Sequence, residues 1–258
     1  MPSFICETCG VEYAESAEPP ERCAICEDER QYVGLNGQRW ITAEKLRADH
    51  CADVREEEPG LLGIGIRPEF AIGQRALLHG GVLWDCVPLL DDETVAAVEA
   101  HGGLRAIALS HPHYYSAISE WSLRFDVPVY VHADDERWLQ RRDGQIELWQ
   151  GETLELGSGL TVIRCGGHFA GACVLHSGEL LLTGDTIQVI PDRAFVSFMY
   201  SYPNLIPLDA AGIRRIVAAV EPFAFDRIYG AWWGRVVRSD AKAAVRRSAA
   251  RYVEAIGG

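Results

Sequence analysis

Long apolar runs are missing from this sequence. No stretch of eighteen consecutive apolar residues occurs, so we expect no membrane-spanning helix. The first ten residues, MPSFICETCG, contain neither a basic leader nor the apolar centre of a signal peptide. We therefore expect a cytoplasmic protein.

Positive charge is also scarce. The chain has 24 lysine and arginine residues against 37 aspartate and glutamate residues, which gives a formal net charge of −13 at pH 7. Phosphate backbones and anionic membranes attract basic surfaces, so we expect neither nucleic acid nor a membrane as a partner. The basic run AKAAVRRSAARYV near the C-terminus is interpreted as the solvated face of a final helix.

No internal repeat or low-complexity linker is present, but the composition changes along the chain. Residues 1–38 have eight acidic residues among the first thirty and almost no apolar periodicity, so they cannot build a core of their own. Residues 39–258 form two halves, each rich in predicted strands and then helical. This pattern predicts an α/β fold in which packed sheets are covered by helices, including helices over 91–103 and 208–222.

Four of the eight cysteines form two CxxC pairs. Thirteen residues separate the pairs, whose members are Cys6, Cys9, Cys23 and Cys26. Four thiolates on two tight turns can close tetrahedrally around one zinc ion, and a metal would allow this acidic segment to fold. We therefore predict a structural zinc site in a zinc-ribbon-like segment, residues 1–38, rather than a disulfide framework.

The two pairs also resemble the knuckles of rubredoxin, in which the metal is iron and carries electrons. Rubredoxin has a longer, aromatic-rich segment between its pairs and a glycine after both. Here that segment contains only Tyr13 as an aromatic residue, and Glu27 follows the second pair. Zinc is therefore the preferred interpretation, and iron is the alternative.

Histidines stand at the ends of predicted strands in the larger segment. His111 and His113 follow the predicted strand LRAIALS and flank Pro112, which fixes the backbone φ between them. His168 lies in the glycine-flanked loop GGHFAG, and Asp185 follows an apolar strand in TGDT. Strand ends are where such scaffolds present functional side chains, and these residue types are typical metal ligands.

In this order the motifs resemble the metallo-β-lactamase fold superfamily. The pattern of that family is HxHxDH, then a histidine in a GHTxG-like loop, an aspartate in GD and a last histidine near the final strand. The similarity extends from about residue 60 to about residue 235. It implies a four-layer αβ/βα sandwich over residues 39–258, hydrolase activity, and a metal held by His111, His113, His168 and Asp185.

The sequence departs from the family pattern at three positions. Tyr115 and Ser116 replace the Asp and His of HxHxDH, and YGAWWG has no histidine where the last one belongs. In the family these residues build the second metal site, so the resemblance implies a single zinc or iron ion with an open position for water. Such a water can have a pKa near 7. We expect Asp185 to be a fourth ligand or to orient this water, and Tyr115 to donate to a developing oxyanion.

Aromatic residues suggest a substrate wall. Residues 193–207, RAFVSFMYSYPNLIP, have no clean period and are interpreted as a binding loop or lid. We predict a pocket for a small, partly apolar substrate, built from Tyr200, Tyr202, Trp232 and Trp233. The alternative is that these side chains pack on the core or form a homodimer contact.

The preferred function is hydrolysis of an ester, thioester or lactone by one metal-bound hydroxide. One alternative is an oxidoreductase with iron at the histidines, fed with electrons by the cysteine knuckle. The other is a non-enzymatic binding or scaffold protein in which the histidine site is a relic. The sequence itself does not select the bond that is cleaved.

Overall fold

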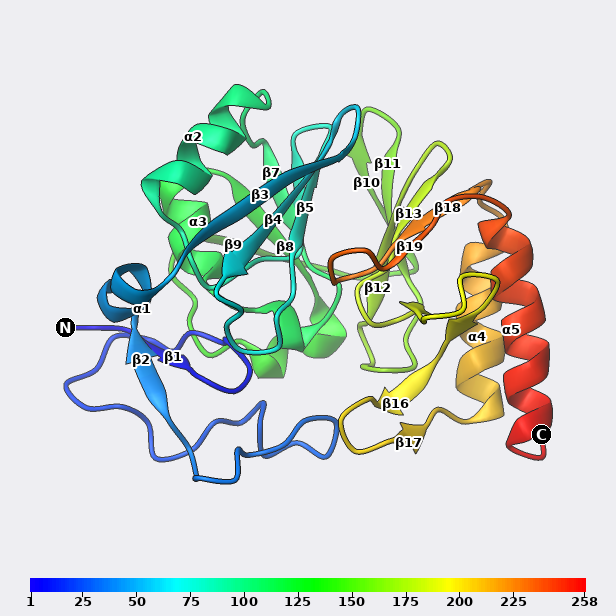
Figure 1. Ribbon diagram of the computed structural model, residues 1–258, viewed down its shortest axis with the longest axis horizontal. Coiled ribbons are helices and arrows are strands. Elements are labelled where there is room, and N and C mark those ends of the chain that lie inside the picture. Colours follow the sequence, from blue (N-terminus) through cyan, green and yellow to red (C-terminus); the bar gives the residue numbers. More distant parts are fainter.

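The computed structural model describes all residues 1–258 and has two packed sheets with helices on both outer faces (Figure 1). The first sheet contains seven strands in chain order: β3 (Cys51–Glu58), β4 (Leu61–Arg67), β5 (Ala76–His79), β6 (Val82–Trp84), β7 (Ala106–Ala108), β8 (Pro128–His132) and β9 (Gln145–Trp149). Its pairs are antiparallel from β3 to β6 and parallel from β6 to β9.

The second sheet has six strands and is antiparallel except where β13 pairs with β18. In spatial order these are β10 (Thr153–Gly157), β11 (Leu160–Arg164), β12 (Cys173–Ser177), β13 (Leu180–Leu182), β18 (Arg227–Tyr229) and β19 (Val236–Val237). Three two-stranded sheets complete the β structure: β1 (Phe4–Cys6) with β2 (Trp40–Thr42), β14 (Gln188–Val189) with β15 (Val196–Ser197), and β16 (Met199–Ser201) with β17 (Ile206–Pro207).

Five α-helices and two short 3-10 helices connect the strands. They are α1 (Ala43–Asp49), α2 (Asp92–Ala100), α3 (Ile118–Phe125), α4 (Ala210–Val220), α5 (Ala241–Ala255), η1 (Pro112–Tyr114) and η2 (Ala133–Trp138). None of these helices is both long and apolar enough to cross a membrane. The basic run at the C-terminus forms α5, as expected, and Arg246 on it is exposed.

Three apolar clusters hold the layers together. One lies between the sheets and includes Trp84 of the first sheet and Val162 of the second. A second joins the first sheet to α2 and α3, and a third joins the second sheet to α4 and α5 through residues such as Ile213 and Val245. Because each sheet is buried on both faces, the sandwich has four layers, which confirms the predicted α/β architecture.

Helix α2 begins where the sequence predicts. Asp91 is its N-cap: the carboxylate accepts hydrogen bonds from the backbone N–H of Thr94 at 2.8 Å and from the N–H of Ala52 at 3.1 Å. The Asp91 side chain therefore satisfies a free helix donor and ties α2 to β3.

Asp91→Ala is expected to lower the free energy of unfolding by about 1–2 kcal/mol, because two buried or half-buried N–H groups lose their acceptor. Urea denaturation followed by circular dichroism measures this loss. The matched control is Asp92→Ala, since Asp92 is exposed and lies in the first turn. Equal effects of the two substitutions would contradict the assigned cap.

One local finding differs from the sequence interpretation, and a second concerns the segment that contains the cysteines. Residues 193–207 contain parts of two small hairpins, β14–β15 and β16–β17, rather than one irregular lid. In addition, β1 pairs with β2 at Trp40–Thr42, so the cysteine-containing segment is joined to the chain just beyond residue 38. The boundary between residues 38 and 39 stays a prediction.

Candidate metal centre

The four expected ligands in the histidine-containing part of the chain meet at the edges of both sheets. His111 and His113 follow β7 at the start of η1, His168 lies in the β11–β12 loop, and Asp185 follows β13. All four side chains are buried, with exposed fractions of 1 to 4%. Their ligand atoms lie within 4.8 Å of one another. The two halves of the sandwich thus contribute two ligands each.

The distances fit one ion at the centre of this group. His168 Nε2 lies 3.4 Å from His113 Nδ1. Asp185 Oδ2 lies 3.5 Å from His111 Nε2, 3.9 Å from His113 Nδ1 and 4.0 Å from His168 Nε2. A tetrahedral zinc ion with ligands at about 2.0–2.1 Å has edges of about 3.3 Å. Small side-chain shifts would therefore close these four atoms around one cation.

The charges of the group also fit a cation. Burial lowers the pKa of His111 to about 4 and lowers the pKa of His168, so both imidazoles are neutral at pH 7. Burial disfavours the charge of Asp185, but its interactions with His111 and His113 outweigh this and hold the carboxyl pKa below its usual range. His111 Nε2 is buried and has no hydrogen-bond partner. Neutral imidazoles beside an ionised carboxylate are the protonation states that a divalent metal requires.

Hydrogen bonds outside the group fix the orientation of its rings. His168 Nδ1 donates to the backbone carbonyl of Tyr200 at 2.8 Å, which leaves the Nε2 lone pair directed at the group. His111 Nδ1 lies 2.9 Å from Ser110 Oγ, and the backbone N–H of Ser110 donates to Asp85 Oδ1 at 2.7 Å. Burial raises the pKa of Asp85 to about 8, so a second buried negative charge near Asp185 is disfavoured.

The tyrosine at this centre is Tyr114, not Tyr115. The Tyr114 hydroxyl donates to Asp185 Oδ1 at 2.9 Å, and its ring lies 4.7 Å from that of His111 between centroids. Tyr115 belongs instead to the apolar cluster under α2 and α3 and makes no hydrogen bond to the four ligands. The η1 turn directs consecutive side chains to different sides, so the oxyanion role expected for Tyr115 has no geometric support.

Tyr114→Phe is expected to weaken metal binding at the histidines by about 10–100-fold, because a buried carboxylate oxygen loses its hydrogen bond. Competition with a chromogenic zinc chelator measures this affinity. Tyr115→Phe is the matched control and should leave the affinity unchanged. A larger loss in Tyr115→Phe than in Tyr114→Phe would contradict the assignment.

The positions that correspond to the second metal site of the family offer no second set of ligands. Ser116 is buried; its hydroxyl donates to the carbonyl of Cys86 at 3.3 Å and accepts from Gln74 Nε2 at 3.2 Å. Ala231 is buried, and Trp232 donates through Nε1 to the carbonyl of Ile72 at 2.7 Å. The His111 group is therefore the one cluster of potential metal ligands in residues 39–258.

A cavity of about 230 Å³ opens beside the group and reaches His113, His168 and Asp185. Its other walls are formed by Gln31, Tyr32, Ile72, Tyr202, Pro203 and Trp232. Because ligand pockets for drug-sized molecules usually span 300–1,000 Å³, a cavity of this volume suits a smaller ligand. The Tyr202 hydroxyl donates to the Asp185 carbonyl at 2.9 Å, which fixes one wall against the metal centre.

The structure brings two of the four predicted substrate residues, Tyr202 and Trp232, to the cavity. Trp233 packs instead against β4, where a Cβ added at Gly63 would lie 2.7 Å from the indole. Tyr200 contributes its backbone carbonyl to His168, while its hydroxyl donates to Glu29 at 2.6 Å. Neither Trp233 nor Tyr200 lines the cavity.

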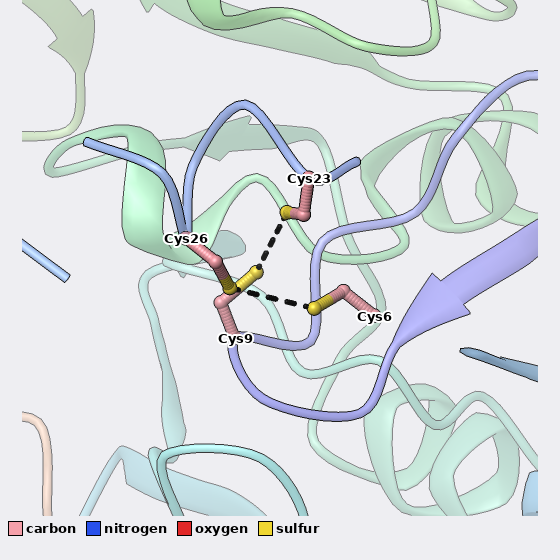
Figure 2. Close-up of side chains that lie close together, drawn as sticks. All are labelled: Cys6, Cys9, Cys23 and Cys26. Atoms are coloured by element: carbon pink, nitrogen blue, oxygen red, sulfur yellow. Dashed lines mark hydrogen bonds between the residues drawn. The ribbon is translucent and has the colours of Figure 1, made fainter. Parts of the chain in front are cut away.

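The cysteines form the second candidate metal centre (Figure 2). Cys6 Sγ lies 3.5 Å from Cys26 Sγ, and Cys9 Sγ lies 3.6 Å from Cys23 Sγ. A tetrahedral zinc ion with sulfur ligands at about 2.3 Å has edges of about 3.8 Å, so the four sulfurs are close to that arrangement. Hydrogen bonds from Cys23 lower the pKa of the Cys6 thiol, and hydrogen bonds from Cys26 lower that of Cys23, whereas burial raises the pKa of Cys9 and the hydrogen bond with Cys23 raises that of Cys26. The metal-free cluster therefore favours two thiolates, and a bound zinc ion would favour the thiolate form of all four.

Residues 27–34, here called the arm, run from the second cysteine pair to the histidine centre beside the β16–β17 hairpin (Figure 1). Arg30 Nη1 donates to the His168 carbonyl at 3.1 Å, and its guanidinium carbon lies 3.8 Å from the centroid of the Phe169 ring. Asn204 Nδ2 donates to the carbonyls of Glu29 and Gln31, both at 2.9 Å. The cysteine segment thus forms part of the cavity wall.

Sequence reasoning missed Tyr114, Gln31, Arg30 and Asp85. Tyr114 adjoins His113, and Asp85 follows β6, so a strand-end position was an available signal for both. Gln31 and Arg30 carry no local signal, because they reach the centre only through contacts with residues more than 130 positions away.

The chain is similar in sequence to a bacterial protein and similar in fold to several solved structures. No protein-family model matches the chain. It is 48% identical over 268 residues to the uncharacterized protein YmaE of Bacillus subtilis (strain 168), with 99% of this chain and 97% of that protein covered.

The solved structures with a similar fold include metallo-β-lactamases. FIM-1 from Pseudomonas aeruginosa, in its mono-zinc form, is 16% identical with a TM-score of 0.58 and covers 80% of this chain and 96% of its own. VMB-1 is 15% identical with the same TM-score and covers 80% and 98%. The chemotaxis sensor ODP, in a structure of its peroxy diiron species, is 18% identical with a TM-score of 0.51; the match covers 78% of this chain and 94% of that chain. The chain therefore belongs to the same family as YmaE and has the metallo-β-lactamase fold.

Proposed function

We propose that the protein is a hydrolase of a small acyl substrate, an ester, thioester or lactone, and that it uses one metal ion at the histidine centre. The observation that carries this proposal is the convergence of four buried ligand atoms from both halves of the sandwich beside a small cavity. A metal ion held there would supply Lewis-acid polarisation of a substrate carbonyl and of a water molecule. Zinc suits three imidazoles and one carboxylate, and it would take the substrate or water oxygen by expanding to five ligands.

The residues around the centre have distinct roles in this proposal. His111, His113 and His168 hold the ion, and Asp185 supplies the negative charge that balances it. The Tyr114 hydroxyl donates to Asp185 Oδ1, which leaves Oδ2 as the carboxylate oxygen near the histidines. Tyr202 and Trp232 provide apolar surfaces that orient the acyl group and exclude bulk water.

A substrate screen tests this function. The zinc-loaded protein is assayed against small esters, thioesters and lactones, with His168→Ala as the background enzyme. Hydrolysis that depends on His168 supports the proposal, and the preferred bond identifies the acyl class. If no ester, thioester or lactone is cleaved above the His168→Ala background, the proposal is rejected.

An oxidoreductase is the second candidate, and one observation favours it. Trp138 packs against the cysteine cluster, and its ring centroid lies 5.7 Å from that of Phe169. The Phe169 ring in turn lies 5.0 Å from the rings of His113 and His168. Aromatic side chains thus lie between the two centres, where they would shorten an electron path between two iron sites. Colourless protein containing zinc at both centres would exclude this candidate.

A further inference from the structure

We propose that Gln31 is a substrate-binding residue that accepts a hydrogen bond from the substrate. The protein then prefers small, uncharged acyl compounds with an N–H or O–H donor close to the reacting carbonyl. This inference rests on the proposed hydrolase function and assigns a part of the substrate site to the arm of the cysteine segment.

The Gln31 side chain is buried and yet has no partner. Gln31 is 5% exposed and lines the cavity together with His113, His168 and Asp185. Its Oε1 is buried without a hydrogen bond. An acceptor removed from water costs free energy unless a donor reaches it. An N–H or O–H group of a ligand in the cavity would therefore supply the hydrogen bond that Gln31 Oε1 lacks.

The backbone of Gln31 is firmly placed. Its N–H donates to the Asp28 carbonyl at 2.9 Å, and its own carbonyl accepts from Asn204 Nδ2 at 2.9 Å. Since the backbone is held at both its N–H and its carbonyl, the attachment point of the carboxamide is fixed relative to the histidine centre. Fixed polar groups give a binding site its selectivity.

Apart from the exposed Tyr32, the other polar side chains of the cavity wall outside the metal-binding group already have partners. The Tyr202 hydroxyl donates to the Asp185 carbonyl, and Trp232 Nε1 donates to the Ile72 carbonyl. Outside the metal-binding group, Gln31 is therefore the buried wall residue whose polar side chain is free for a ligand. Ile72, Pro203 and the rings of Tyr32, Tyr202 and Trp232 make most of the remaining wall apolar.

Apart from the proposed metal ion, the cavity wall has no positive charge that would select a carboxylate or phosphate. No lysine or arginine lines it. Arg30 is close by, but its guanidinium is engaged by the Asp28 carboxylate at 2.8 Å and by the His168 carbonyl at 3.1 Å. The cavity volume of about 230 Å³ limits the acyl group to a small one. These features favour a neutral substrate.

A matched pair of esters tests the inference. Methyl N-acetylglycinate has one N–H donor, and methyl 4-oxopentanoate has a methylene group in the same place. Hydrolysis adds water across the acyl C–O bond and releases methanol and the acid, which proton NMR follows. Saturation-transfer NMR on the same samples measures binding, so the readout does not depend on turnover alone.

The wild-type protein is expected to prefer methyl N-acetylglycinate by about five- to tenfold, in kcat/KM or in Kd, as one added hydrogen bond predicts. In Gln31→Leu and Gln31→Met this preference should disappear while the metal content is unchanged. Gln150→Leu is the matched control, because Gln150 is exposed and lies outside the cavity, and it should keep the preference.

Three outcomes overturn the inference: a wild-type protein without the preference, both Gln31 variants with the preference intact, or no binding of either ester at millimolar concentration. The hydrolase proposal is judged separately. Selective binding that depends on Gln31 without any methanol release would support the binding role and count against hydrolysis. Turnover of other acyl compounds that the Gln31 substitutions do not affect would support hydrolysis and count against the binding role of Gln31.

Discussion

Cys23→Ser is expected to remove one metal ion per chain and to lower kcat/KM at the histidine centre by at least about a hundredfold. Metal binding to a structural cysteine site contributes about 10–16 kcal/mol of folding free energy, which the acidic N-terminal segment cannot supply from its own core. The apolar cluster of this segment consists mainly of the cysteines themselves, with Val11 and Ile25. Loss of the ion should therefore release the arm.

The consequence for catalysis follows from the contacts of the arm. Gln31 and Tyr32 form one wall of the cavity, and Arg30 donates to the carbonyl of His168. When the arm is released, the substrate loses this wall while the four ligands of the histidine centre stay in the sandwich. We therefore expect KM to change more than kcat. The metal ion at the histidines should be retained.

Elemental analysis, steady-state kinetics on the ester found by the screen and limited proteolysis of residues 1–40 measure these effects. Cys51→Ser is the matched control, because Cys51 is half-buried on β3 and belongs to neither cluster. One lost metal ion with unchanged kcat/KM would contradict the coupling. It would mean that contacts such as the pair between Glu12 and Arg141, at 3.0 Å, hold the segment without the metal.

The sequence predicts those parts of the protein that depend on local pattern and residue order. Periodic apolar residues such as Val95 and Val98 locate the helices, and both are buried. The spacing of the cysteines and the order of the histidine and aspartate motifs predict which side chains gather, and the structure brings both groups together. Each of these features can be predicted from the spacing of a few neighbouring residues or from the order of known motifs.

The parts that the sequence does not predict depend on side-chain direction and on distant contacts. Tyr114 and Tyr115 are adjacent, and only the backbone of η1 decides that Tyr114 faces Asp185 while Tyr115 joins the core. Gln31 reaches the cavity because the β16–β17 hairpin holds the arm through Asn204, a contact across 173 residues. Neither the direction of a side chain in a short turn nor a contact between distant segments produces a periodic pattern in the sequence.

His168→Ala is expected to remove the other metal ion and to lower kcat/KM by at least about a thousandfold. The substitution deletes one of four ligands, and it leaves Asp185 buried with fewer partners for its charge. Without the ion the reaction loses its Lewis acid, whose contribution is several kcal/mol of transition-state stabilisation. About two metal ions per chain in the wild type should fall to about one, with the cysteine centre still loaded.

The matched control is His101→Ala, because the His101 side chain lies at the end of α2 and belongs to no metal-binding group. It should retain both ions and full turnover. If His168→Ala keeps its fold and turns over every substrate as the wild type does, the histidine centre is not catalytic, and a binding or scaffold protein is the better description. If the ion lost from His168→Ala is iron, the search for a reaction moves to redox substrates, and iron at the cysteine centre as well would make the aromatic side chains Trp138 and Phe169 a path between two redox-active metals.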